Sequence, residues 1–373
     1  MNRKIWIIGG AVVLLAIVIA VWLAKSPQKD EIVIPVVADL TGPIALYGKW
    51  AVDGVTMAIE DVNAKGGINE RKLRLVVEDG QSTPQVGVSA FQKLVSVYHP
   101  AVIIVATNTG TVMACAAIAN QQQVVLFTPI ASGPSVTQAG DFVFRNRVSG
   151  YYEASEMARL AAERFGLKRV ALAVINNEAG PGYIEAFKKV FGVKGGNITE
   201  TVLLDPGKTD YRTQVLKVQA SNPDAVFLAL TVKEAATFIK QSQEVRFRPK
   251  WLSMTTVQSD ELFKIAGEAA EGLVFVAEGG DEKNPEYRAF ADRYEKTFGS
   301  APAMNALNGY DAVQILAGLI AKSGADGRSI RDALYRTRNY QGVGGVLSFD
   351  ENGDANKPLM LMEVKSGRFA RLE

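Results

Sequence analysis

Three hydroxyl side chains lie in two short polar loops, each of which follows an apolar run rich in β-branched residues. Thr109 and Thr111 follow residues 102–105, and Ser132 follows residues 124–127. Hydroxyls beside the unpaired N–H groups at the start of a helix are suited to a carboxylate, because those groups and the helix dipole favour an anion. The pattern therefore indicates a cradle for a small carboxylate.

The elements that position these hydroxyls are two predicted parallel strands joined by a helix over about residues 112–121. The carboxyl ends of parallel strands meet at one edge of an open α/β sheet, where ligand crevices form. The same residues also suit helix caps and tight turns, a role that Ser and Thr often take. Judged from these loops alone, both interpretations remain open.

The composition is that of an ordinary folded protein, and it excludes several kinds of site. Of the 373 residues, 48% are hydrophobic and 21% are charged, and the net charge of +2 does not indicate nucleic-acid binding. With one cysteine (Cys115) and one histidine (His99), the chain has no metal-ligand cluster and no catalytic dyad. No glycine-rich phosphate-binding motif follows a predicted strand. We therefore expect no metal, no cofactor and no enzymatic activity.

The N-terminus carries a targeting signature. Asn2-Arg3-Lys4 precedes an apolar run over residues 5–24 that is long enough to cross a bilayer. A cleavage signature at residues 18–20 lies inside this run, which slightly favours an uncleaved anchor over a removed signal peptide. Positive residues before the run place the remainder outside the cytoplasm. We expect a periplasmic or extracytoplasmic protein that residues 5–24 could tether to the cytoplasmic membrane.

Strands and helices alternate in two series, one before about residue 147 and one after it. This alternation predicts two α/β lobes, each with a mostly parallel sheet. The predicted strands cover residues 32–38, 72–79, 102–105, 124–127, 169–175, 197–204, 225–230, 251–254 and 272–277. Near the end, an Asn352-Gly353 turn between residues 346–349 and 358–364 predicts a closing hairpin.

Several segments together resemble the branched-chain amino acid substrate-binding proteins of ABC transporters, and the resemblance covers nearly everything after residue 31. The segments are residues 38–43 with Tyr47 and Gly48, and residues 61–68, 129–135, 267–272 and 347–354. The resemblance implies the type I periplasmic binding protein fold. In that fold two Rossmann-like lobes with mostly parallel sheets are joined by three hinge crossovers and close on a ligand.

The two alternation series, with polar crossings at residues 145–150, 278–281 and 341–345, predict where the lobes divide. Residues 31–147 and 279–344 are expected to form the first lobe, and residues 148–278 and 345–373 the second. Residues 1–30 are the preceding signal or anchor segment and its linker.

The family's ligand site carries over to particular positions of the first lobe. Thr109 and Ser132 match hydroxyl positions that hold the ligand's α-carboxylate, with backbone groups near Gly110 and Ile130 assisting. Tyr47 matches an aromatic position of the same lobe. The resemblance thus agrees with the carboxylate cradle inferred from the two loops.

The second lobe departs from the family's pattern. The acidic residue that pairs with an α-ammonium falls on Thr255, and the two cleft tyrosines fall on Gly180 and Thr231. A buried ammonium without a carboxylate partner costs several kcal/mol. Glu178 could substitute, although a solvated loop residue is the simpler interpretation. The ligand is therefore expected to be an amino acid or a related organic acid, which can be larger than a branched-chain amino acid.

These observations predict a solute-binding protein rather than an enzyme. It would trap a small carboxylate-bearing ligand between its lobes and deliver it to the permease subunits of an ABC transporter, acting as a monomer without nucleic acid. The alternative is a membrane-tethered module that senses the ligand and reports to a separate signalling partner. A hydrolase built on this fold is disfavoured, because the sequence offers no catalytic dyad.

Overall fold

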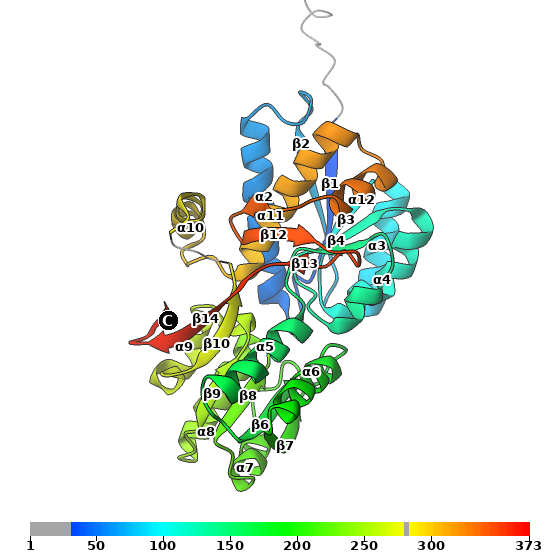
Figure 1. Cartoon of the computed structure of the whole chain (residues 1–373). Coiled ribbons are helices and arrows are strands. Elements are labelled where there is room, and N and C mark those ends of the chain that lie inside the picture. The colour runs from blue at the N-terminus through cyan, green and yellow to red at the C-terminus, as the bar shows by residue number, and fades with distance from the viewer. Residues whose placement is uncertain (1–30, 280–282) are drawn as a thin grey trace, which may run out of the picture.

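The computed structural model describes residues 31–279 and 283–373, which form two lobes, one above the other (Figure 1). No helix in these ranges is long and apolar enough to span a membrane. The predicted anchor at residues 5–24 lies outside the described residues.

The first lobe is built on a five-stranded parallel sheet with the order β2-β1-β3-β4-β5. The strands are β1 (Ile32–Ala38), β2 (Leu73–Asp79), β3 (Val102–Ala106), β4 (Val125–Thr128) and β5 (Val143–Arg145). Successive residues of one strand enter different cores: Val36 packs with α2 and α11, and Val37 packs with α3 and α4. Burial on both faces explains why β1, β3 and β4 are nearly continuous apolar runs, whereas the edge strand β2 carries charged residues.

The helices of the first lobe cover both faces of this sheet. One face carries α2 (Ala45–Ala64), α11 (Met304–Ser323) and α12 (Gly327–Tyr335), and the other carries α3 (Pro84–Tyr98) and α4 (Thr109–Gln122). A Cβ atom on Gly54 of α2 would come within 2.0 Å of the Ala306 carbonyl oxygen of α11. The same atom on Gly309 of α11 would lie 2.3 Å from the Ala51 carbonyl oxygen. These two glycines therefore allow α2 and α11 to pack at close range. The lobe also includes α10 (Pro285–Phe298) and the 3-10 turn η1 (Pro134–Gln138).

The second lobe holds a seven-stranded sheet with the order β15-β14-β10-β9-β8-β6-β7. Five parallel strands form its centre and one edge: β6 (Arg169–Ile175), β7 (Asn197–Leu204), β8 (Ala225–Ala229), β9 (Lys250–Ser253) and β10 (Val274–Glu278). The last two strands, β14 (Leu359–Lys365) and β15 (Arg368–Arg371), run antiparallel to their neighbours.

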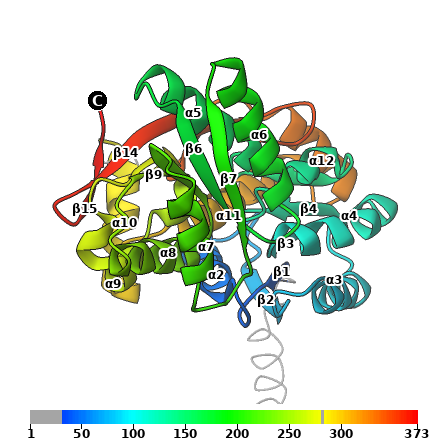
Figure 2. The ribbon, with the colours of Figure 1, turned by 90° about the horizontal axis from the view of Figure 1, so that it is seen from below.

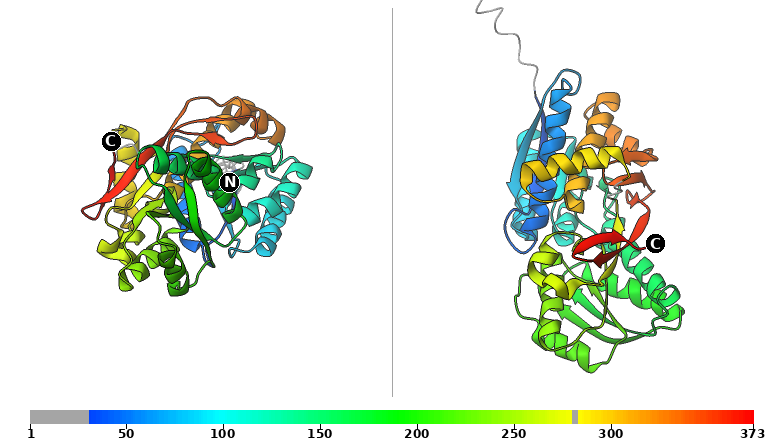
Figure 3. Two further views of the ribbon diagram at one scale, coloured as in Figure 1. Left: turned by 60° about the horizontal axis from the view of Figure 1, so that its bottom comes forward. Right: turned by 90° about the vertical axis from the view of Figure 1, so that its left-hand side faces the viewer.

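The helices of the second lobe also lie on both faces of their sheet (Figures 2 and 3). On one face are α5 (Gly150–Glu163) and α6 (Gly180–Val193), and on the other are α7 (Arg212–Ala220), α8 (Val232–Glu244) and α9 (Glu261–Ala266). Two 3-10 turns, η2 (Thr255–Val257) and η3 (Gly267–Ala270), follow β9 and α9. The predicted organisation into two α/β lobes is confirmed.

The segment after α12 differs from the sequence-based expectation. It forms a small sheet of β11 (Tyr340–Gly342), β12 (Gly345–Phe349) and β13 (Ala355–Asn356). The ring of Phe349 lies 5.9 Å from that of Phe127 and 5.7 Å from that of Phe144, and Arg145 pairs with Asp354 at 2.6 Å. Residues 345–356 therefore pack on the first lobe, although they were expected in the second.

This arrangement also changes the predicted hairpin. The turn at Asn352-Gly353 joins β12 to the short strand β13, whereas β14 leaves this sheet and pairs with β10. The third connection between the lobes consequently runs between β13 and β14. The first lies between β5 and α5, and the second between β10 and α10.

Candidate ligand-binding site

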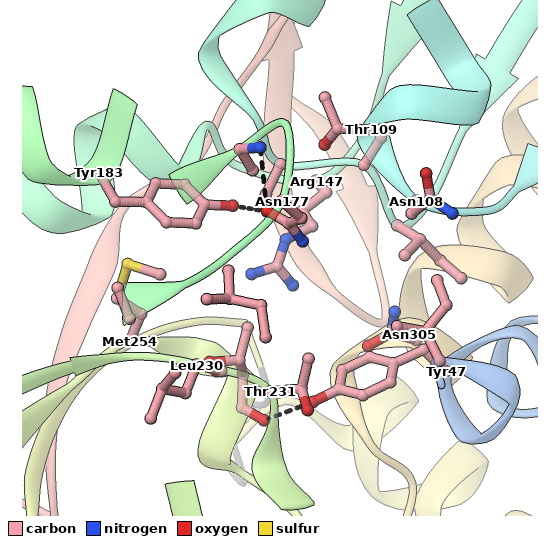
Figure 4. Close-up of a pocket in the computed structure, with 18 residues that line it drawn as sticks. Tyr47, Asn108, Thr109, Arg147, Asn177, Tyr183, Leu230, Thr231, Met254 and Asn305 are labelled. Atoms are coloured by element: carbon pink, nitrogen blue, oxygen red, sulfur yellow. Dashed lines mark hydrogen bonds between the residues drawn. The ribbon is translucent and has the colours of Figure 1, made fainter. Parts of the chain in front are cut away.

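A cavity lies between the two lobes, at the carboxyl ends of strands from both sheets (Figure 4). Its empty space of about 570 Å³ includes a part that is open to solvent. Its lining residues are Ile44, Tyr47, Asn108, Thr109, Ile130, Ala131, Ser132, Arg147, Ile175, Asn177, Ala179, Tyr183, Ala229, Leu230, Thr231, Met254, Thr256 and Asn305.

Asp39, at the end of β1, fixes the loops on the first-lobe side of the cavity. Its carboxylate accepts hydrogen bonds from the backbone N–H of Ser82 at 2.9 Å and from that of Asn108 at 3.2 Å. Three loops that follow neighbouring strands are thus held by one buried side chain. Burial raises the pKa of Asp39 to about 6, although these N–H donors oppose the shift.

The N-terminus of α4 opens toward the cavity, as the sequence predicted for the first polar loop. Asn108 caps this helix by accepting a hydrogen bond from the Thr111 N–H at 3.0 Å. Thr109 lines the cavity, and its Oγ1 accepts from the Gly133 N–H at 3.1 Å, so its own hydroxyl hydrogen can be donated to a ligand. Thr111 does not line the cavity: its side chain lies against Gly87 of α3.

Ser132 and Tyr47 both reach across the cavity to the second lobe. The Ser132 hydroxyl lies 2.7 Å from the Tyr183 hydroxyl of α6. The Tyr47 hydroxyl accepts from the Val232 N–H at 2.7 Å and donates to the Thr256 carbonyl oxygen at 3.2 Å. Burial raises the pKa of Tyr47, so the phenol stays neutral and keeps both bonds. The lobes are therefore closed against each other.

The remaining predicted site residues fall into two groups. Ile130 and Thr231 line the cavity, but the Thr231 hydroxyl donates to the Glu234 carboxylate. Gly110, Gly180 and Thr255 are not among the lining residues.

Each of these three has another environment. Gly110 borders an adjoining hollow that also includes Glu178, the suggested substitute for the ammonium partner. Gly180 packs so tightly that a Cβ would lie 2.2 Å from the Ile175 carbonyl oxygen. The Thr255 backbone N–H and hydroxyl both donate to Glu153, which is fully buried. Their predicted role in ligand binding therefore stays a prediction.

Several lining residues were not predicted from the sequence. Tyr183 stands one helical turn after Gly180, so it brings a phenol to the region where the resemblance had placed a lost tyrosine. Asn305, at the start of α11, has a buried Nδ2 without a hydrogen-bond partner among the described residues. Arg147 comes from the first connection between the lobes, and no local pattern distinguishes it from a surface arginine.

The charged side chain on the cavity wall is positive. Among the described residues that form the cavity wall, Arg147 is charged, and none is an aspartate or a glutamate. The described residues also contain no group of three or more His, Cys, Asp or Glu side chains that could hold a metal ion. Chemically, the cavity offers hydroxyl, amide and guanidinium donors to an acidic ligand.

Known proteins resemble this chain along nearly its whole length. A family model described as periplasmic binding protein matches residues 31–368. A leucine-, isoleucine-, valine-, threonine- and alanine-binding protein of Pseudomonas aeruginosa is 27% identical, and the match covers 91% of each chain. A Leu/Ile/Val-binding protein of Rhizobium johnstonii is 28% identical over 94% of this chain and 96% of the relative.

The solved structures agree with the sequence relatives. A leucine-binding protein from Thermotoga maritima superimposes with a TM-score of 0.84 at 28% identity, covering 92% of this chain and 98% of that one. The resemblance stated from the sequence motifs is confirmed, and so is the fold that it implied. The chain belongs to the periplasmic binding protein family and has the type I fold of its branched-chain amino acid binding members.

Proposed function

We propose that this protein is an extracytoplasmic solute-binding protein that traps a small carboxylate-bearing ligand and delivers it to an ABC permease. The observation that carries the proposal is a cavity between two lobes, with the N-terminus of α4 and the hydroxyls of Thr109 and Ser132 on its wall. A helix N-terminus with adjacent hydroxyl donors is a site that favours a carboxylate.

The cross-lobe contacts explain how the ligand would be retained. Ser132 and Tyr183 join the lobes on one side of the cavity, and Tyr47 joins them to Val232 and Thr256 on the other. A carboxylate that accepts a hydrogen bond from Ser132 would therefore bind between groups of both lobes. Binding of this kind favours the closed arrangement over the open one, since the open one lacks half of the contacts.

The relatives support binding and transport rather than catalysis. Those named above are amino acid binding proteins. Transfer to a permease, action as a monomer and a tether at residues 5–24 belong to the proposal, and the sensor that reports to a signalling partner is its alternative.

Direct binding measurements test the proposal. We expect at least one ligand from a panel of amino acids and organic monocarboxylates to raise the melting temperature, because a ligand at 100 times its Kd stabilises the folded state by about 2.7 kcal/mol. A matched panel of amines and neutral sugars should have no effect. Stabilisation by a sugar or an amine, with no response to any acid or amino acid, would contradict the proposal.

A further inference from the structure

Arg147 lines the cavity and belongs to the first connection between the lobes. Its guanidinium lies between Tyr183 on one side and Tyr47 on the other (Figure 4). The side chain is 2% exposed, and its Nε atom is buried without a hydrogen-bond partner among the described residues. A buried donor without a partner is costly, so an acceptor that reached this nitrogen from the cavity would be bound favourably.

Two buried carboxylates that do not line the cavity pair with the guanidinium. Arg147 Nη2 lies 3.1 Å from Glu153 Oε2, and Nη1 lies 3.6 Å from Glu278 Oε1. Burial disfavours the charged form of Arg147, but these two carboxylates outweigh that effect and raise its pKa. The group facing the cavity is therefore a permanent cation.

Each of these two carboxylates also accepts a hydrogen bond from another donor, although Glu278 Oε1 has no hydrogen-bond partner among the described residues. Glu153 also accepts from the backbone N–H of Thr255 at 3.1 Å, and Glu278 accepts from that of Val148 at 2.9 Å and faces Lys357 at 3.5 Å. Neither glutamate is among the residues that line the cavity. Arg147 is thus the member of this buried ionic cluster that a ligand can reach.

Because Arg147 lines the cavity and the two glutamates do not, the cavity favours acceptor groups of a ligand over an ammonium group. An α-ammonium in the cavity would approach a guanidinium and would find neutral acceptors but no carboxylate on the wall to offset its desolvation. A carboxylate, or a carbonyl or hydroxyl on the adjacent carbon, could accept a hydrogen bond from Arg147. Thr255, where the resemblance places the ammonium partner, supplies no charge, and the nearby Glu153 is paired with Arg147 and does not line the cavity.

We infer that Arg147 is a ligand-binding and specificity-determining residue, and that it selects monocarboxylic acids without an α-ammonium over amino acids. The expected class comprises 2-oxo acids, 2-hydroxy acids and unsubstituted aliphatic or aromatic acids. The inference rests on the proposed function and narrows its ligand.

Calorimetry with ligands matched in carbon skeleton tests this selectivity. One series compares leucine, α-ketoisocaproate and isocaproate, and the other compares phenylalanine, phenylpyruvate and hydrocinnamate. We expect the ammonium-free acids of at least one series to bind about tenfold or more tightly than the amino acid. Equal or tighter binding of the amino acid overturns the selectivity but leaves the proposed function intact. Failure of every acid and amino acid in a wider screen overturns both.

Three variants assign the selectivity to Arg147. Arg147→Gln should weaken the best acid about tenfold to a hundredfold, as expected for the loss of a charge-assisted hydrogen bond, and should reduce its advantage over the amino acid. Arg147→Lys keeps the charge without the planar fork, so it should retain part of the advantage. The control is Lys357→Gln, which removes another buried cation facing Glu278 but does not alter the cavity wall. It should lower the melting temperature while the affinity ratio stays the same.

The variants are interpretable even if one charge change destabilises the fold. Arg147→Gln combined with Glu153→Gln removes one charge of each sign and should fold where the single variant does not. The inference is overturned if a folded variant without Arg147 keeps the wild-type ratio of acid to amino acid affinity. It is also overturned if Lys357→Gln changes that ratio as much as Arg147→Gln does.

Discussion

The two walls of the cavity differ in chemistry. The first lobe contributes strand-end loops and the start of α4, with Asn108, Thr109 and Ser132 as polar groups. The second lobe contributes more apolar side chains, with Ile175, Ala179, Ala229, Leu230 and Met254, and its polar residues are Asn177, Tyr183, Thr231 and Thr256. Hydrogen-bond donors recognise a charged end, whereas an apolar surface recognises shape and size. One lobe is therefore suited to holding what ligands of a class share, and the other to distinguishing them.

The largest effect is expected from placing a charge on the apolar wall. Met254→Glu should weaken carboxylate binding more than about a hundredfold, because two like charges about 4 Å apart repel by about 4 kcal/mol near a protein surface. Met254→Gln has nearly the same shape and no charge, and it should cost far less. Calorimetry on both variants checks this, and equal losses would show that shape rather than charge is responsible.

Removing hydroxyl groups should weaken binding on the first-lobe wall and have little effect on the second-lobe wall. Thr109→Val and Ser132→Ala should each weaken acid binding about tenfold to a hundredfold, since a hydrogen bond to a charged group contributes about 1.5–3 kcal/mol. Thr231→Val is the matched change on the second lobe, where the hydroxyl is already bonded to Glu234. It should leave the affinity almost unchanged. A loss at Thr231 equal to that at Thr109 would contradict the division between the walls.

A smaller effect is expected from the bond that connects the walls. Tyr47→Phe removes the acceptor of the Val232 N–H, so the closed arrangement should lose about 1 kcal/mol and the affinity should fall about fivefold. Tyr310→Phe is the control, because the Tyr310 hydroxyl bonds Asp61 within the first lobe. Small-angle scattering of the liganded variants would report the closure directly, and an unchanged affinity for Tyr47→Phe would show that the bond does not support closure.

The smallest change in affinity should come from the titration of Asp39, which lies beneath the polar loops of the first lobe. Asp39 is protonated below its pKa of about 6 and ionised above it. Ionisation adds a negative charge near the start of α4, so carboxylate affinity should fall about twofold to threefold between pH 5 and pH 8. In Asp39→Asn the affinity should be flat over this range. A rise in affinity with pH in the unmodified protein would contradict this assignment.

The fold was largely predictable, because it depends on local periodicity. The first strand was predicted over residues 32–38, as observed, and the apolar runs identified both parallel sheets. The placement of residues 345–356 was not predictable, since a turn at Asn352-Gly353 shows that two strands pair but not which lobe they join. That choice depends on distant contacts, such as Phe349 with Phe127 and Arg145 with Asp354.

The site was predictable where it follows strand ends and not where it depends on long-range packing. Tyr47, Thr109, Ile130, Ser132 and Thr231 all reach the cavity. Tyr183 could have been found, because a tyrosine one turn after Gly180 lies near the same face of the helix. Arg147 could not, since its importance arises from Glu153 and Glu278, which approach it from other elements.

The hydrogen bonds of Tyr47 across the cavity have a consequence for kinetics. If a ligand leaves past the Tyr47 contacts with Val232 and Thr256, these bonds must break first, and its residence time then depends on the rate of lobe opening. Two ligands of different affinity would then dissociate at rates closer than their affinities suggest, if opening precedes release for both. A partner that pulls α2 and α8 apart would accelerate release without touching the ligand.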